Sequence, residues 1–248
     1  MHNPLYRKNK IFVDLSPEKV EWIVFWSRDY HHFLKHRSYF HSYKLFFHFT
    51  IISAHSILEK QHISLSKAVK QAELLAQYYG GDHIIWRYDP IVFWREDNHL
   101  VSNFNESEFA EYCRLLSACG ITRCFFSFVT HYFKFIKRFQ TKYPHYTLVP
   151  PDYVEIKKIL DVMKNHTSNF DINLFSCCND NLVDDIIKRG SCISGKFLNH
   201  LSGKKTVSEA RSPTREECAC TRSIDIGDYV QQPCYFGCIY CYANPVWR

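Results

Sequence analysis

The stretch SLSKAVKQAELLAQYYGGDHIIWRYDP, residues 64–90, contains a helix followed directly by a strand. The helical part begins at Ser64 and continues to about Tyr79, where Gly80 closes it. Residues 83–88, HIIWRY, are rich in aromatic and β-branched side chains and are typical of a buried strand. The glycines at this junction are therefore interpreted as a helix end. This unit predicts an α/β fold built on a parallel sheet.

Similar units extend on both sides of this stretch. Aromatic or β-branched runs that read as buried strands occupy residues 22–26, 45–52, 124–129 and 170–175. Further helices are expected over residues 105–119 and from 152 to about 165. Strands spaced by helices imply parallel βαβ units. We therefore predict an incomplete parallel β/α barrel of the TIM type, in preference to an open parallel sheet.

The chain divides by composition into two parts. Residues 1–190 are predicted to form the barrel-like domain. Residues 191–248 are predicted to form a polar linker and then a cysteine-rich metal-binding segment. The chain has 248 residues, of which 46% are hydrophobic, so it is long and apolar enough to bury a core.

Charge and cysteine content restrict the compartment and the chemistry. The net charge of +6 permits an anionic partner such as nucleic acid. No apolar run reaches the ~18 residues of a membrane helix, and residues 1–10 lack the apolar core of a signal peptide. We therefore expect a cytoplasmic protein with no membrane partner. Thiols stay reduced in the cytoplasm, so the eleven cysteines point to metal ligation and not to disulfides.

The strongest chemical signal lies near the C-terminus, in CYFGCIYC. There Cys234, Cys238 and Cys241 form a C-x3-C-x2-C run. Thiolates are soft ligands that select zinc, copper(I) or iron–sulfur clusters, and structural zinc sites usually present paired C-x2-C units. Three thiolates on a four-iron cluster leave one iron open for a small molecule. The spacing therefore predicts a [4Fe–4S] cluster, with zinc as the alternative.

The same run, with Tyr240 as an aromatic residue between the last two cysteines, resembles the cluster motif of radical S-adenosylmethionine enzymes, particularly the spore photoproduct lyase branch. This resemblance implies S-adenosylmethionine as a cofactor, with Tyr240 beside it. It also implies an electron donor and a small-molecule or nucleic-acid substrate. In that superfamily the motif follows the first barrel strand, whereas here it ends the chain.

The whole chain resembles the domain-of-unknown-function family 1848, bacterial proteins with this cysteine cluster at their C-terminus. The matching stretches are VFWS (24–27), IWRYDP (85–90), GSCI (190–193), REECAC (215–220), SIDIG (223–227) and CYFGCIYCYA (234–243). Members usually begin with a strand and a Ser-Arg-Arg-Thr-Asp segment before the Asn-Pro that is Asn3-Pro4 here. We therefore expect this chain to start late and to lack the first barrel strand.

A second group of cysteines precedes the tail. Cys177, Cys178 and Cys192, together with Cys218 and Cys220, are enough to furnish the four ligands of a second metal site. The family resemblance supports Cys192 and one of the adjacent pair, for which we take Cys178. The alternative is that these cysteines are small buried apolar residues. Cys113, Cys119 and Cys124 lie in a predicted helix and strand and are expected in the core.

Charged residues at strand ends complete the candidate site. Arg87 and Asp89 end the strand HIIWRY, and the carboxyl ends of barrel strands form the active face. We predict that they bind a carboxylate, ribose or phosphate of the cofactor or substrate; the alternative is a structural ion pair. Arg28 and Asp29 stand similarly after an earlier strand and are weaker candidates.

Two functions follow from these observations. The first is an iron–sulfur enzyme of the radical S-adenosylmethionine type, whose substrate and catalytic residues the sequence leaves open. The second is a non-catalytic binding or redox protein in which a cluster or zinc fastens the tail. A complete glycine-rich cofactor loop after a strand would favour the enzyme, and the sequence contains no such loop.

Overall fold

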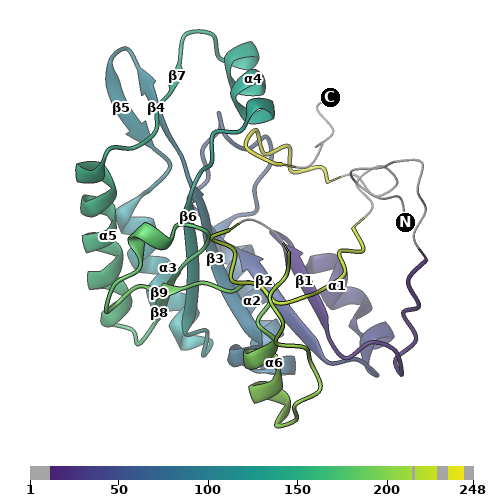
Figure 1. Cartoon of the computed structure of the whole chain (residues 1–248). Coiled ribbons are helices and arrows are strands. Elements are labelled where there is room, and N and C mark those ends of the chain that lie inside the picture. The colour runs from purple at the N-terminus through teal and green to yellow at the C-terminus, as the bar shows by residue number, and fades with distance from the viewer. Residues whose placement is uncertain (1–11, 214–215, 228–233, 243–248) are drawn as a thin grey trace.

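The computed structural model describes residues 12–213, 216–227 and 234–242, and the predicted late start at Asn3-Pro4 lies outside these ranges. The chain folds around a six-stranded sheet whose strands all run parallel (Figure 1). The strands, in spatial order, are β1 (Ile23–Ser27), β2 (Leu45–Thr50), β3 (Ile84–Ile91), β6 (Arg123–Phe128), β8 (Asn173–Ser176) and β9 (Lys188–Arg189). The predicted α/β class and parallel sheet are confirmed. In the described ranges the sheet ends at β1 and β9 and does not close into a complete barrel.

The predicted helices are present, and local chemistry sets their ends. They are α2 (Leu65–Tyr79), α3 (Glu106–Ala118) and α5 (Tyr153–Ser168). The Asn105 side chain caps α3 by accepting from the Glu108 N–H at 3.0 Å, and Asp152 caps α5 in the same way. Helix α2 ends at Gly80, whose φ of 93° favours glycine, so the helix-end interpretation of these glycines is confirmed.

Several elements went unrecognised in the sequence. The helices are α1 (His31–His36), α4 (Phe133–Lys142) and α6 (Gly195–Ser202), with 3-10 turns η1 (Arg37–Phe40), η2 (Gly81–His83) and η3 (Asp180–Leu182). An antiparallel sheet joins β5 (His99–Ser102), β4 (Phe93–Glu96) and β7 (Thr147–Leu148). Asp97 and Asn98 connect β4 to β5, both with positive φ, as two-residue hairpin turns require.

The main core lies between one face of the parallel sheet and helices α1, α2, α3 and α5. Phe47, Trp86 and Phe126 point into it from neighbouring strands and are almost completely buried. Each buried aromatic side chain of this size contributes roughly 1.5–3 kcal/mol through the hydrophobic effect. This face therefore holds the strands in place and leaves the opposite face available for other contacts.

The opposite face of the sheet is covered by α6 and the segment around it, here called the strap (residues 190–213). Phe46, Ile85 and Phe125 form a smaller core there with Leu198 of α6. Within the strap, Gly195 lies so close to Ser208 that a Cβ atom at Gly195 would come within 2.2 Å of the Ser208 carbonyl oxygen. The polar segment after residue 190 thus contains a helix packed on the sheet.

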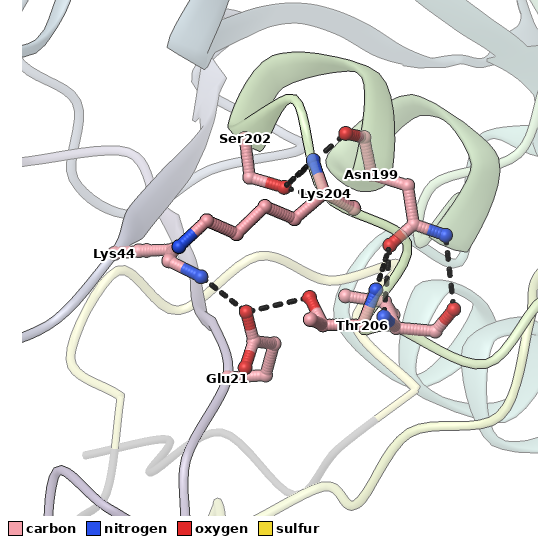
Figure 2. Close-up of polar contacts among 7 residues, drawn as sticks. Glu21, Lys44, Asn199, Ser202, Lys204 and Thr206 are labelled. Carbon is pink, nitrogen blue, oxygen red and sulfur yellow. Dashed lines mark hydrogen bonds and ion pairs between the residues drawn. The ribbon is translucent and has the colours of Figure 1, made fainter.

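Figure 2 shows how the polar part of the strap is fastened. The Asn199 side-chain oxygen accepts from the backbone N–H groups of Thr206 at 3.0 Å and Val207 at 2.8 Å. The Thr206 hydroxyl donates to Glu21, just before β1, at 2.7 Å. Asn199 therefore holds the residues after α6 against that helix, and Thr206 connects them to the segment before β1.

Candidate metal centres at the strand ends

The predicted cysteine ligands lie near the C-terminal ends of the parallel strands. Because the strands are parallel, these ends all lie on the same side of the sheet, and the cysteines are in the loops and the tail found there. They form two groups. The tail site contains Cys234, Cys238 and Cys241, with Arg28, Glu59 and Tyr240 around them. The strap site contains Cys177, Cys178, Cys192 and Cys220, with Arg87 beside them.

The tail is attached to the loop that follows β2. The Ile239 N–H donates to the Leu58 carbonyl at 2.8 Å, and the Gln61 N–H donates to the Phe236 carbonyl at 3.1 Å. Ile239 is completely buried between this loop, α4 and β4. In Figure 1 the tail, in yellow, lies beside α4 at this end of the sheet. The backbone of the cysteine run is therefore held in a defined position.

A buried charged network surrounds Cys238. Arg28, which directly follows β1, donates to the Cys238 sulfur at 3.2 Å and to the Glu59 carboxylate at 3.2 Å. Glu59 also accepts from the Tyr240 hydroxyl at 2.5 Å and from the His55 N–H at 3.1 Å. Glu59 is only 3% exposed, so these donors replace the water that the carboxylate loses on folding.

The network sets the protonation of its members. Burial opposes the charge of Arg28, but Tyr240 and Glu59 outweigh that effect, and the pKa of Arg28 is raised. Burial raises the pKa of the Cys238 thiol, and the Arg28 guanidinium opposes this shift. Arg28 is therefore a permanent cation that donates a hydrogen bond to the sulfur of a candidate ligand.

The other tail cysteines lie nearer the surface. Cys234 is exposed and Cys241 is half-buried. The Cys241 N–H donates to the Cys238 carbonyl at 3.1 Å, which forms a turn between the two. Arg138 of α4 donates to the Cys241 carbonyl at 2.6 Å, and the Tyr132 hydroxyl donates to the Tyr240 carbonyl. Helix α4 and the residue before it thus hold the backbone of the tail.

The strap site brings four thiols into a chain of contacts. The sulfur atoms of Cys177 and Cys192 are 3.2 Å apart. The side chain of Cys178 interacts with that of Cys177, and the side chain of Cys220 interacts with that of Cys192. The Ile193 N–H also donates to the Cys220 sulfur at 3.5 Å. Hydrogen bonds from Cys177 and Cys220 lower the pKa of Cys192. Residues from the end of β8, from the strap and from the following loop therefore meet at one point.

Arg87 of β3 links this group to the sheet. Its guanidinium is paired with Asp89, with Nε and the Asp89 oxygen 3.0 Å apart, and Nη1 donates to the Cys192 sulfur at 3.0 Å. His48 of β2 hydrogen-bonds the Cys192 carbonyl at 2.8 Å. The two residues predicted to bind a cofactor thus contact each other, while Arg87 also faces the thiols. Their predicted cofactor contact stays a prediction.

The other cysteines lie at the border of the strap site or in and beside the main core. Cys218 interacts electrostatically with Cys220 at the border of the strap site. Cys113 and Cys124 are completely buried in the main core, as expected, and Cys119 at the end of α3 is half-buried. Glu59 was missed by sequence reasoning, because an acidic residue in an irregular loop carries no motif.

The donors suit soft metals, although they are not arranged as a finished site. Within residues 12–213, 216–227 and 234–242, no three His, Cys, Asp or Glu side chains already stand around a common centre at ligand distance. The chemistry of the donor set nevertheless fits a thiophilic metal: the tail and the strap both supply several thiols, and in each a buried arginine donates to one sulfur.

These features define an α/β protein with a parallel sheet and thiol groups gathered at its strand ends. Residues 1–243 match the family model described as Domain of unknown function (DUF1848), and the chain belongs to that family. No curated protein and no solved structure gave a significant match. Among the helices of the described residues, none is long and apolar enough to cross a membrane.

Proposed function

We propose that this protein binds an iron–sulfur cluster through Cys234, Cys238 and Cys241 and is a radical S-adenosylmethionine-like protein with its motif at the end of the chain. The supporting observation is the contact between Cys238 and Arg28. Arg28 is the first residue after β1, so Cys238 lies at the C-terminal end of a strand of the parallel sheet. The enzymes that the motif resembles also carry their cluster cysteines after a barrel strand.

The side chains around the motif suit this role. The three thiolates hold the cluster, and the bound cluster would supply one electron to a ligand on its open iron. Arg28 donates to a ligating sulfur, which favours the thiolate form. Glu59 keeps Arg28 oriented, and Tyr240 donates to Glu59 from within the motif. Cys234 is exposed, so the same motif has a solvent-facing side.

A second candidate function is a non-catalytic protein in which the metal only fastens the tail. The backbone bonds of Ile239 and Gln61 favour it, because they already attach the tail to the loop after β2. In this case a cluster or zinc binds, but S-adenosylmethionine is not cleaved.

The test is anaerobic purification followed by measurement of iron, sulfide and visible absorbance. We expect a brown protein that loses its colour in the Cys238→Ala variant and keeps it in the matched Cys119→Ala variant, whose thiol lies in α3's C-terminal turn. Dithionite and S-adenosylmethionine are then added, and 5′-deoxyadenosine is measured. Its formation supports the enzyme, whereas a coloured protein that forms none supports the fastening role. Protein that is free of iron would refute cluster binding.

A further inference from the structure

The strap site differs from the tail site in its geometry. Its thiols come from three separate segments: Cys177 and Cys178 follow β8, Cys192 begins the strap, and Cys220 lies in the loop after it. The Cys177 and Cys192 sulfurs are 3.2 Å apart, the Cys220 sulfur accepts from the Ile193 N–H at 3.5 Å, and Cys178 is next to Cys177 in the chain. Thiols from three segments thus lie near one buried arginine, Arg87, which is paired with Asp89 and also donates to the Cys192 sulfur.

The distance between the thiol sulfurs differs between a single metal ion and an iron–sulfur cluster. Zinc–thiolate bonds of ~2.3 Å in a tetrahedron place neighbouring sulfurs about 3.8 Å apart. The Cys177 and Cys192 sulfurs are 3.2 Å apart, so one ion could contact both after a small outward movement of the side chains. Thiolates on a four-iron cluster bind separate irons and stand much farther apart. The close approach therefore favours a single metal ion over a cluster.

The backbone around the four thiols is already held in place. The Cys177 N–H donates to the Phe126 carbonyl at 2.9 Å, and the Gly190 N–H donates to the Ser176 carbonyl at 2.7 Å. Thr221, next to Cys220, donates to the Ile193 carbonyl at 2.8 Å. These bonds tie β8, the strap and the following loop together.

Cys178 has an unusual backbone conformation. Its φ is +56°, a left-handed conformation that non-glycine residues seldom adopt. Adjacent residues of a strand point to opposite faces, but here the chain turns directly after β8. The Cys178 side chain interacts there with that of Cys177.

We propose that Cys177, Cys178, Cys192 and Cys220 bind one thiophilic divalent ion, with zinc as the best fit, independently of the tail site. Each thiol releases its proton to solvent as it binds the ion. Arg87, 8% exposed, donates to the Cys192 sulfur and offsets part of the negative charge of a four-thiolate centre. The ion joins the strap and the loop after it to β8.

The experiment separates this site from the tail site. A variant combining Cys234→Ser, Cys238→Ser and Cys241→Ser is prepared without oxygen and titrated with zinc or cobalt(II) against a chelator. We expect about one ion per chain and the cobalt absorption typical of tetrahedral four-thiolate coordination. Loss of iron in this variant with retention of zinc would show that the two sites are separate.

In the same background, Cys192→Ser is expected to weaken zinc binding at least ~10-fold, as loss of one ligand should. The matched Cys119→Ser variant should bind like its parent. Circular dichroism checks that each variant is folded, and Cys220→Ser replaces Cys192→Ser if the latter does not fold. A parent that binds no cobalt, or folded variants of both cysteines that bind as tightly as the parent, would overturn the proposal.

Discussion

Replacing Glu59 by alanine should destabilise the protein strongly. Glu59 has no exposed side-chain surface, and its partner Arg28 is only 15% exposed. Removing one member of a buried ion pair leaves the other charge without compensation and typically costs about 3–5 kcal/mol. The Tyr240 hydroxyl and the His55 N–H lose their acceptor as well. For a protein of this size each kcal/mol lowers the melting temperature by about 2–4 °C, which predicts a decrease of roughly 6–20 °C.

Urea denaturation measures this effect as a shift in midpoint with an unchanged dependence on urea. The matched control is Glu73→Ala, because Glu73 pairs with Lys70 on the surface of α2, where both side chains are at least half exposed. Such a pair contributes about 0–1 kcal/mol. Hydrogen exchange at Ile239 should also become faster in Glu59→Ala, since this network supports the tail. A Glu59→Ala variant no less stable than Glu73→Ala would refute the reasoning.

Three further predictions concern the strap, the sheet and pH. Asn199→Ala should cost about 1–3 kcal/mol by leaving the Thr206 and Val207 N–H groups unpaired, and hydrogen exchange at both should accelerate; unchanged exchange would contradict it. Phe125→Ala should lower the unfolding free energy by about 3–5 kcal/mol, because this completely buried ring is removed from the core beneath the strap, and a loss under about 1 kcal/mol in urea titration would contradict it. Burial lowers the pKa of His131 below its usual 6.5, so the unfolded chain binds the extra proton first; stability is complete above pH 6.5 and falls as the pH decreases below it. NMR titration of the ring measures this pKa, and a value above 6.5 would contradict the prediction.

Local sequence patterns were sufficient to predict the main helices and strands. The continuous apolar run of β2 is what a strand buried on both faces requires, and Asn105 and Asp152 mark helix starts by their capping chemistry. The short helix α6 was not predicted, because its eight residues precede a charged stretch and its stability comes from the packing of Leu198 on the sheet. The β4–β5 hairpin also escaped, although Asp97-Asn98 was a readable turn signal.

The sequence by itself determined the chemistry available to this protein: the cysteines, their spacing in the tail and the alternation of helices and strands are all local properties of the chain. Only the tertiary structure decided which groups meet. Arg28 and Cys238 are 210 positions apart, and Cys177 and Cys192 belong to segments that the sheet brings together. The physical reason is that parallel strands end at one edge, so side chains far apart in the chain become neighbours there, and no local pattern records which of them will touch.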